Sequence, residues 1–170
     1  MKKYVFKPYN PSFPALFACE KMRILKAISE SLMIEHVGST AVPGLGGKGI
    51  VDIAIAVNIS DFPAISSKLQ SLGYEFQESG SVPERWFFIV DLPDQEESIR
   101  RYHVHLTSFE SIEWNGLIAF REYLKSHPET AEEYARLKKA AVEQADGDGA
   151  EYRRLKNPFF QEVLNKTKKV

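Results

Sequence analysis

The chain has 170 residues, a length typical of one domain with its own hydrophobic core. Hydrophobic residues make up 44% of it and charged residues 26%, which is close to the soluble average and excludes disordered and collagen-like chains. The 22 Lys and Arg residues nearly balance the 23 Asp and Glu residues, so no overall basic field supports binding to nucleic acid. We expect a single domain over residues 1–170.

The start of the chain and its single cysteine indicate in which cellular compartment the protein is expected. The basic first residues have no apolar stretch behind them, so they do not form a secretory signal. The longest apolar stretch, 49–57, is shorter than the roughly 20 residues that span a bilayer. Cys19 lies beside Phe17, Ala18 and Met22, which predicts a small buried side chain without a zinc partner. We therefore expect a cytoplasmic protein with no membrane segment.

The first part of the chain predicts a helix, a strand and a loop. Apolar residues recur at helical spacing over about 14–31, and Ser12 stands where a capping side chain is expected. The apolar run 33–37 predicts a short strand, and the glycines of 43–47 predict a loop with sharp turns. We expect the helix to cover a sheet.

The β-branched run 50–57 predicts a central strand of that sheet. Alternation places its bulky residues on one face and Asp52, Ala54 and Ala56 on the other. One face is therefore apolar, and the other carries a lone carboxylate.

The next segment predicts a helix between strands. Ser60 and Asp61 precede a helical run over 62–72, and Gly73 stands where a helix is expected to stop. A further short strand is expected at 74–77.

Two more strands are expected at 85–90 and 101–107. An acidic loop over 91–100 separates them, which predicts an antiparallel pair with a long connection. The aromatic residues 86–88 are expected in the core or in a pocket wall.

From 111 onwards the apolar spacing is helical. Helix-ending signals at 126–128 and 146–149 divide this part into three helices. We predict an α+β fold with a sheet core over about 33–107 and C-terminal helices over about 111–167.

A Gly-Ser pair at the end of the first strand offers an anion site. Gly38, Ser39 and Thr40 expose backbone N–H groups and small hydroxyls that can bind phosphate oxygens. Lys48 does not follow the glycine spacing of a P-loop, so a Walker-type NTPase is not expected. Asp52, in the following strand, is placed to hold a hard cation such as Mg²⁺ against the phosphate.

The string HVGSTAVPGLGGK, which begins at His36, and the VDI that begins at Val51 resemble the GrpB family of the nucleotidyltransferase superfamily. The resemblance continues through Tyr102-His103-Val104-His105-Leu106, Phe120-Arg121-Glu122-Tyr123-Leu124, His127-Pro128-Glu129, Tyr134, Lys138, Tyr152 and Lys156. It implies a nucleotidyltransferase-like mixed β-sheet flanked by helices. It also implies transfer of a nucleoside monophosphate from a nucleoside triphosphate, with Mg²⁺ held by acidic residues at alternate strand positions and by a third carboxylate on a later strand.

The chain departs from the superfamily pattern at one position. Ala54 stands where the second metal-binding carboxylate belongs, and alanine cannot bind a metal. Two functions are therefore kept open. One is a metal-assisted nucleotidyl- or phosphoryl-transferase that acts on a small-molecule or protein acceptor. The other is a degenerate, non-catalytic member that binds a nucleotide or another anionic ligand.

His103 and His105 offer a partial replacement for the missing carboxylate. Residues two apart point to the same face of a strand, so both imidazoles can converge on Asp52 and bind a metal. Mg²⁺ is the expected ion, with Mn²⁺ or Zn²⁺ as alternatives, and Asp52 is the expected catalytic residue. The alternative is that the two histidines belong to the polar face of an ordinary strand.

The C-terminal helices repeat a short pattern. Tyr134 precedes Lys138 by four residues, and Tyr152 precedes Lys156 by the same spacing, so each pair shares one helix face. Such a pair can stack a base and neutralise a phosphate. The alternative is an amphipathic helix with lysine stems lying over buried tyrosines.

The expected ligand is a nucleotide or another phosphorylated small molecule. Arg121 is a candidate for anion contact and equally for a surface ion pair, and His36 is a candidate for a proton relay, a phosphate contact or a structural hydrogen bond. The residues expected to bind the ligand are Gly38, Ser39, Thr40, Lys48, Arg121, Tyr134 and Lys138.

Overall fold

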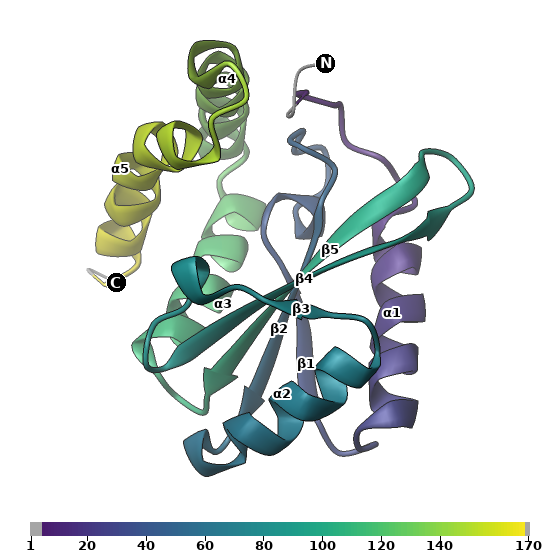
Figure 1. Ribbon diagram of the computed structural model, residues 1–170. Helices are drawn as coiled ribbons and strands as arrows, with labels where there is room; N and C mark the ends of the chain where they lie inside the picture. Colours follow the sequence, from purple (N-terminus) through teal and green to yellow (C-terminus); the bar gives the residue numbers. More distant parts are fainter. Residues whose placement is uncertain (1–4, 169–170) are drawn as a thin grey trace.

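A computed structural model describes residues 5–168 and has a mixed five-stranded sheet at its centre (Figure 1). In spatial order the strands are β1 (Met33–Val37), β2 (Val51–Val57), β5 (Ser98–Ser108), β4 (Arg85–Asp94) and β3 (Glu75–Phe76). Strands β2 and β5 are parallel, and the other neighbouring strands are antiparallel.

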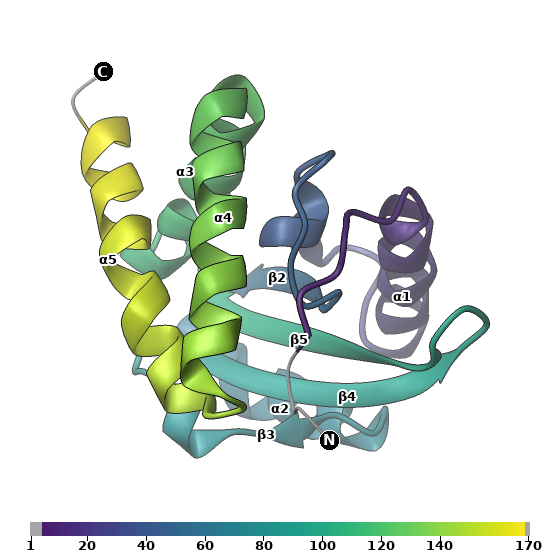
Figure 2. The same cartoon turned by 90° about the horizontal axis from the view of Figure 1, so that it is seen from above.

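Five α-helices among the described residues flank this sheet. They are α1 (Phe13–Ala27), α2 (Phe62–Ser71), α3 (Ile112–Ser126), α4 (Pro128–Ala145) and α5 (Gly149–Thr167), with 3₁₀ turns η1 (Ser39–Ala41), η2 (Ile59–Asp61) and η3 (Glu78–Gly80). Figures 1 and 2 show α3, α4 and α5 gathered on one side of the molecule and α1 on the other. The predicted α+β fold, with a mixed sheet and a helical C-terminal part, is confirmed. No helix among residues 5–168 has the length and apolar character that crossing a bilayer requires.

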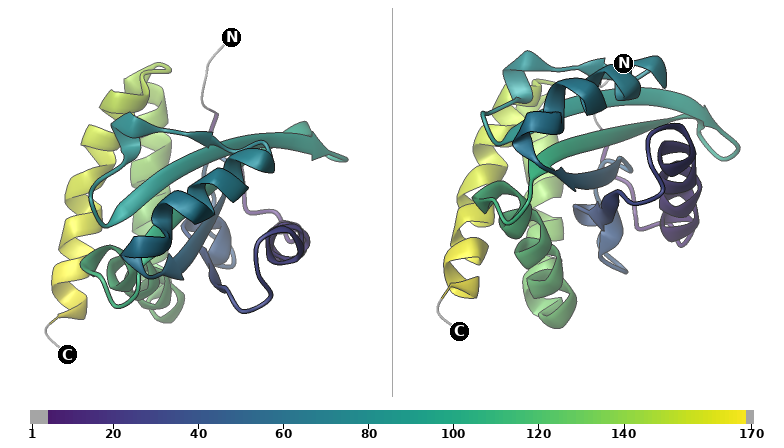
Figure 3. Two further views of the ribbon diagram at one scale, coloured as in Figure 1. Left: turned by 60° about the horizontal axis from the view of Figure 1, so that its bottom comes forward. Right: turned by 90° about the horizontal axis from the view of Figure 1, so that it is seen from below.

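The main hydrophobic core lies on one face of the sheet. Ile53 of β2 and Val104 of β5 pack there with Ile24 of α1 and Leu69 of α2, and all four are fully buried. A second cluster, which includes Val42, joins the glycine-rich loop to α3, α4 and α5. Figure 3 shows α2 lying along the sheet and the β4–β5 hairpin projecting beyond it. Asp52 lies on the face of β2 opposite Ile53 and the main core.

The long connection predicted over 91–100 is wrong, because most of it is strand. Strands β4 and β5 run on to a three-residue turn at 95–97. The Asp94 carboxylate accepts hydrogen bonds from the backbone N–H groups of Glu96 (2.9 Å) and Glu97 (2.8 Å), and Ser98 takes a positive φ of 64°. These local bonds close a tight hairpin without glycine.

The predicted first helix is shorter than expected, and its cap is different. The helix ends at Ala27 instead of 31, where Ser29 and Ser31 hydrogen-bond to each other and compete with helical bonds. The Ser12 hydroxyl donates to Glu96 at 3.1 Å and makes no capping bond. Asp61 likewise makes no capping bond, whereas Gly73 (φ 93°) ends α2 as predicted.

The prediction that Cys19 is buried is wrong, because its side chain is exposed. The neighbouring position on the buried face of α1 is taken by Glu20, which is only 4% exposed. Its carboxylate accepts from Arg23 (2.7 and 2.9 Å) and from the Tyr74 hydroxyl (2.6 Å). A satisfied ion pair therefore replaces the apolar contact that the sequence suggested.

Two adjacent arginines of β5 allow a matched test of the hairpin. Arg100 is 1% exposed and donates to Asp94 (3.1 Å) and to the Gly49 carbonyl (3.1 Å). Arg100→Ala should lower the free energy of unfolding by about 3 kcal/mol, because it strands a carboxylate and a carbonyl. Arg101 pairs with Asp91 in solvent, so Arg101→Ala should cost at most about 1 kcal/mol. Urea unfolding of both variants checks this, and equal losses would contradict it.

Candidate functional site

The site is built where β2 and β5 lie side by side. Their parallel register places Asp52 opposite His103 and Ala54 opposite His105. His103 Nδ1 and His105 Nε2 each donate to Asp52 Oδ1 over 3.2 Å. The structure therefore brings together the three residues predicted as a metal set, and it joins them by direct hydrogen bonds.

These hydrogen bonds fix the charge of the group. Burial opposes ionisation of Asp52, but the bonds from His103 and His105 outweigh it and hold the pKa of the carboxyl well below its usual range. Burial lowers the pKa of His105, and its Nδ1 atom is buried without a hydrogen-bond partner among the described residues. Asp52 is therefore a fixed carboxylate.

Aromatic residues form one wall beside the histidines. Phe87 of β4 stacks on His105 at 5.2 Å between ring centroids and meets His103 edge-on at 4.9 Å. Trp86 instead contacts Phe62 and Phe76, and Phe88 is fully buried. Of the three aromatic residues at 86–88, Phe87 forms the wall and the other two belong to the core.

The Gly-Ser turn lies against Asp52. Gly38 has a φ of 72°, and a Cβ atom added there would lie 2.6 Å from Asp52 Oδ2. Only glycine fits this close approach without displacing the carboxylate. Ser39 then begins η1 and stays half-buried.

Thr40 and His36 belong to the other side of the turn. The Thr40 hydroxyl hydrogen-bonds with His36 Nε2 (2.9 Å), and the imidazole stacks on Phe17 at 4.7 Å between ring centroids. Burial lowers the pKa of His36 to about 4, so the ring is neutral at pH 7. Of the three roles considered for His36, the structure shows the structural hydrogen bond. The Thr40 hydroxyl is taken up by that same bond.

Lys138 reaches the turn from α4. Its ammonium donates to Ser39 Oγ (2.6 Å) and to the Gly46 carbonyl (2.5 Å), and it lies 4.6 Å from the centre of the Tyr134 ring. The lysine side chain is only 2% exposed. Tyr134 and Lys138 therefore share one helix face, as predicted, and meet the predicted loop.

The second Tyr-Lys pair lies beside the first. The ammonium groups of Lys48 and Lys156 lie 4.0 and 5.4 Å from the centre of the same Tyr152 ring. Burial, followed by the charge of Lys156, lowers the pKa of Lys48 to about 8. Both lysines keep partial exposure, so a ligand can reach them.

Arg121 does not join this group of lysines. It donates to Glu35 (2.6 Å), to Glu122 (2.6 Å) and to the His36 carbonyl (2.8 Å). Two roles were considered for Arg121, contact with an anionic ligand and an ion pair, and the structure shows the ion pair. The pair with Glu35 links α3 to β1. Glu35 is the register partner of Ala54, so a carboxylate does face this part of the sheet, but Arg121 neutralises it.

The donor set does not fit the two-metal scheme. Ala54 is fully buried and leaves Asp52 as the only carboxylate that β2 contributes to this face. Mg²⁺ prefers oxygen ligands, whereas the neighbours of Asp52 are two imidazoles. Among residues 5–168, no group of three or more His, Cys, Asp or Glu side chains is arranged to hold a metal ion. The three predicted ligands are joined by hydrogen bonds instead.

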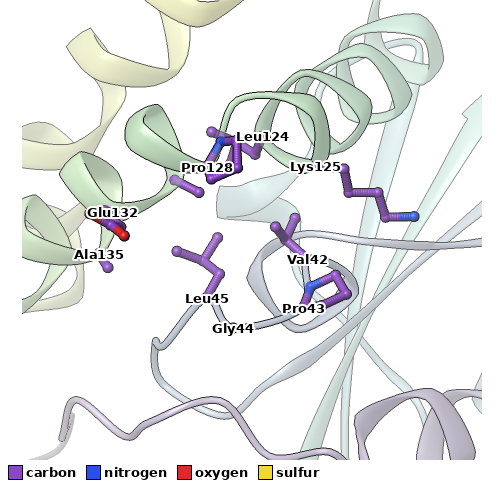
Figure 4. A pocket seen from close by; sticks show the side chains of 10 residues that line it. Val42, Pro43, Gly44, Leu45, Leu124, Lys125, Pro128, Glu132 and Ala135 are labelled. Atoms are coloured by element: carbon purple, nitrogen blue, oxygen red, sulfur yellow. The ribbon is translucent and has the colours of Figure 1, made fainter.

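An apolar cleft of about 480 Å³ opens elsewhere on the same loop (Figure 4). It lies between the glycine-rich loop and the junction of α3 with α4, and none of the predicted site residues lines it. Its lining is Val42, Pro43, Gly44, Leu45, Leu124, Lys125, Pro128, Ala131, Glu132 and Ala135.

The N-terminal segment supports the site in a way that the sequence did not indicate. Lys7 and Gly47 exchange backbone hydrogen bonds of 2.7 and 2.9 Å, and a Cβ atom added at Gly46 would lie 2.6 Å from the Phe6 ring. The two segments are about forty residues apart, so no local pattern could have revealed their pairing. This contact holds the loop that presents the Gly46 carbonyl to Lys138.

The comparisons with known proteins identify the family. A family model described as "GrpB protein" matches residues 3–166. The chain belongs to the GrpB family. A UPF0157 protein of Pseudomonas aeruginosa is 34% identical over 161 residues, which are 94% of this chain and 65% of that protein. The glutamate-rich protein GrpB of Alkalihalophilus pseudofirmus is 29% identical over 92% of this chain and 91% of its own length.

Solved structures place the fold among nucleotidyltransferases. GrpB from Enterococcus faecalis aligns with a TM-score of 0.77 at 24% identity, over 95% of this chain and 98% of that one. A chain of the GLD-2/RNP-8 complex aligns at 0.60 with 12% identity, over 92% of this chain and 59% of its own. The Cid1 poly(U) polymerase aligns at 0.51 with 14% identity, over 81% of this chain and 42% of its own. These likenesses show the fold alone.

Gly38 and Gly44 both have a positive φ, but only Gly38 lies against Asp52. Comparing alanine variants of the two separates the cost of backbone strain from the cost of the contact. Gly38→Ala should lower the free energy of unfolding by about 3 kcal/mol, since it combines the left-handed strain with a clash. Gly44 has a φ of 80° with nothing within 4 Å of an added Cβ, so Gly44→Ala should cost only about 1 kcal/mol. Thermal and urea unfolding measure the difference. NMR signals of His103 and His105 should shift in the first variant alone, and equal effects would contradict the contact.

Proposed function

We propose that this GrpB-family protein binds a nucleotide or another phosphate-bearing small molecule beside Asp52. The observation that carries this proposal is the gathering of three lysines around one carboxylate. Lys48 comes from the loop before β2, Lys138 from α4 and Lys156 from α5, and each lies over a tyrosine ring.

The lysines bring like charges together near Asp52. Two ammonium groups share the Tyr152 ring, and the nearby carboxylate, Asp52, already accepts from two histidines. Gathering like charges at half-buried positions is unfavourable, and an anion bound between them offsets that cost. Phosphate groups supply such charge together with several hydrogen-bond acceptors.

The fold favours a nucleotide among phosphate-bearing ligands. The likeness to the GLD-2/RNP-8 chain covers 92% of this chain and the likeness to Cid1 covers 81%, and the aligned structure of Cid1 is described as bound to MgATP. The rings of Tyr134 and Tyr152 are only 3% and 2% exposed, so the structure shows the alternative in which lysines lie over buried tyrosines, and no free ring face is left for a base.

Loss of one lysine tests the binding proposal. Lys156→Met should weaken binding of a nucleoside triphosphate about 10- to 100-fold, because it removes one charge-assisted contact. Lys166→Met, on the exposed face of the same helix, should leave binding unchanged. Isothermal titration and the ligand-induced rise of melting temperature measure the effect. A triphosphate that raises the melting temperature equally in both variants would contradict the site.

The lowered pKa of Lys48 should make the affinity for the ligand depend on pH. An anion binds the charged form of the lysine, and the free protein loses that charge as the pH rises through about 8. Affinity should therefore fall between pH 7.5 and 9. Lys48→Arg keeps its charge over this range and should make the fall shallower. Titrations at both ends of the range check this, and identical profiles would remove Lys48 from the binding group.

Metal-assisted nucleotidyl or phosphoryl transfer is the second candidate. It is favoured by Asp52, which stays ionised at a position that keeps partial exposure. Turnover of nucleoside triphosphates should be measured with Mg²⁺, Mn²⁺, Zn²⁺ or EDTA. Metal-dependent turnover that is lost in Asp52→Asn, with nucleotide binding retained, would establish the transferase. Turnover that is unchanged in Asp52→Asn would exclude it.

A further inference from the structure

Ser39 and Lys138 form a polar pair that charge compensation alone does not explain. Ser39 Oγ and Lys138 Nζ are 2.6 Å apart, and Lys138 is buried. Its other polar contact is the Gly46 carbonyl at 2.5 Å. Among residues 5–168 no carboxylate forms an ion pair with Lys138, so both acceptors of its ammonium are neutral.

The surroundings favour the neutral amine of Lys138. Burial, followed by the charges of Lys156 and Lys48, lowers the pKa of Lys138 to about 7, and Asp52 opposes this shift. A large fraction of the amine is therefore uncharged at pH 7. One of its N–H groups can then donate to Gly46, while its lone pair accepts the hydroxyl proton of Ser39.

We propose that Ser39 is a nucleophile and that Lys138 is its general base. A serine hydroxyl becomes reactive when a base within hydrogen-bond reach takes its proton, and lysine serves as that base in some serine enzymes. The inference rests on the proposed function, because the bound phosphate-bearing ligand would supply the electrophile.

The reaction balances without any further reagent. Ser39 Oγ attacks the phosphorus of a phosphoanhydride, a phosphoester bond forms at the serine, and the anhydride bond breaks. The hydroxyl proton passes to Lys138, which then returns it to the departing phosphate. Lys48 and Lys156 stand where they can offset negative charge on the phosphoryl oxygens.

The other charged and titratable groups around the pair do not supply the base. Asp52 is held by His103 and His105, and Lys48 and Lys156 lie over the Tyr152 ring. Burial raises the pKa values of Tyr134 and Tyr152, so their hydroxyls stay protonated. Of these groups, Lys138 alone is hydrogen-bonded to Ser39.

A fluorophosphonate probe tests the pair directly. Ser39 Oγ would bond to the probe's phosphorus, fluoride would leave, and Lys138 would take the proton. Intact-mass and peptide mass spectrometry should find one adduct, on Ser39, and none in Ser39→Ala. Labelling should slow about 100-fold or more in Lys138→Met, the usual scale of general-base catalysis. Lys139→Met, at an exposed neighbour, should label at the rate of the unmodified protein.

Lys138→Arg distinguishes a base from a structural contact. Arginine keeps a charge and hydrogen-bond donors but cannot take a proton near neutral pH. The labelling rate of the unmodified protein should rise as the pH passes through about 7, and this rise should be absent in Lys138→Arg. Circular dichroism on each variant confirms that it is folded before labelling is compared.

The outcomes separate this inference from the proposed function. No adduct on Ser39 would overturn the nucleophile, whether or not a nucleotide binds. Equal labelling in the unmodified protein and in folded Lys138→Met or Lys138→Arg would overturn the base. An adduct that depends on Lys138, in a protein whose melting temperature no nucleotide raises, would support the pair and overturn the proposed ligand instead.

Discussion

The parallel pairing of β2 with β5 is the constraint on which the rest of the site depends. Parallel strands need a crossover, and here the chain forms α2, β3 and β4 before β5 returns beside β2. The register then sets Asp52 against His103 and places both histidines on one face. A shift of one residue would turn the histidines toward the main core and remove the hydrogen bonds to Asp52.

The second hydrophobic cluster joins the three C-terminal helices to the glycine-rich loop. Val42 and Leu45 of the loop pack with Phe120 of α3 and Tyr134 of α4, so the loop and the helices hold one another in place. Lys138 of α4 reaches the loop at Ser39 and Gly46, and Lys156 of α5 lies over Tyr152. Hydrophobic packing therefore sets where the lysines lie. The free energy gained by this packing offsets the repulsion between their charges.

Much of the fold could be predicted because its signals are local. The β-branched run around Asp52, the stop at Gly73 and the helix-ending residues 146–149 each act within a few positions. The site could be predicted only in part. Alternation showed that His103 and His105 share a face, but which residues stand opposite them depends on strand order. The roles of Arg121 and the N-terminal segment depend on contacts between distant segments, and no periodic pattern records such contacts.

The ion pair between Arg121 and Glu35 neutralises one carboxylate on the face of the sheet that carries Asp52. Glu35 is the register partner of Ala54, so its carboxylate belongs to the same face as Asp52. Left unneutralised, it would add a second negative charge to this face of the sheet. Arg121 of α3 therefore helps to set the charge of the face beside which we propose that an anion binds.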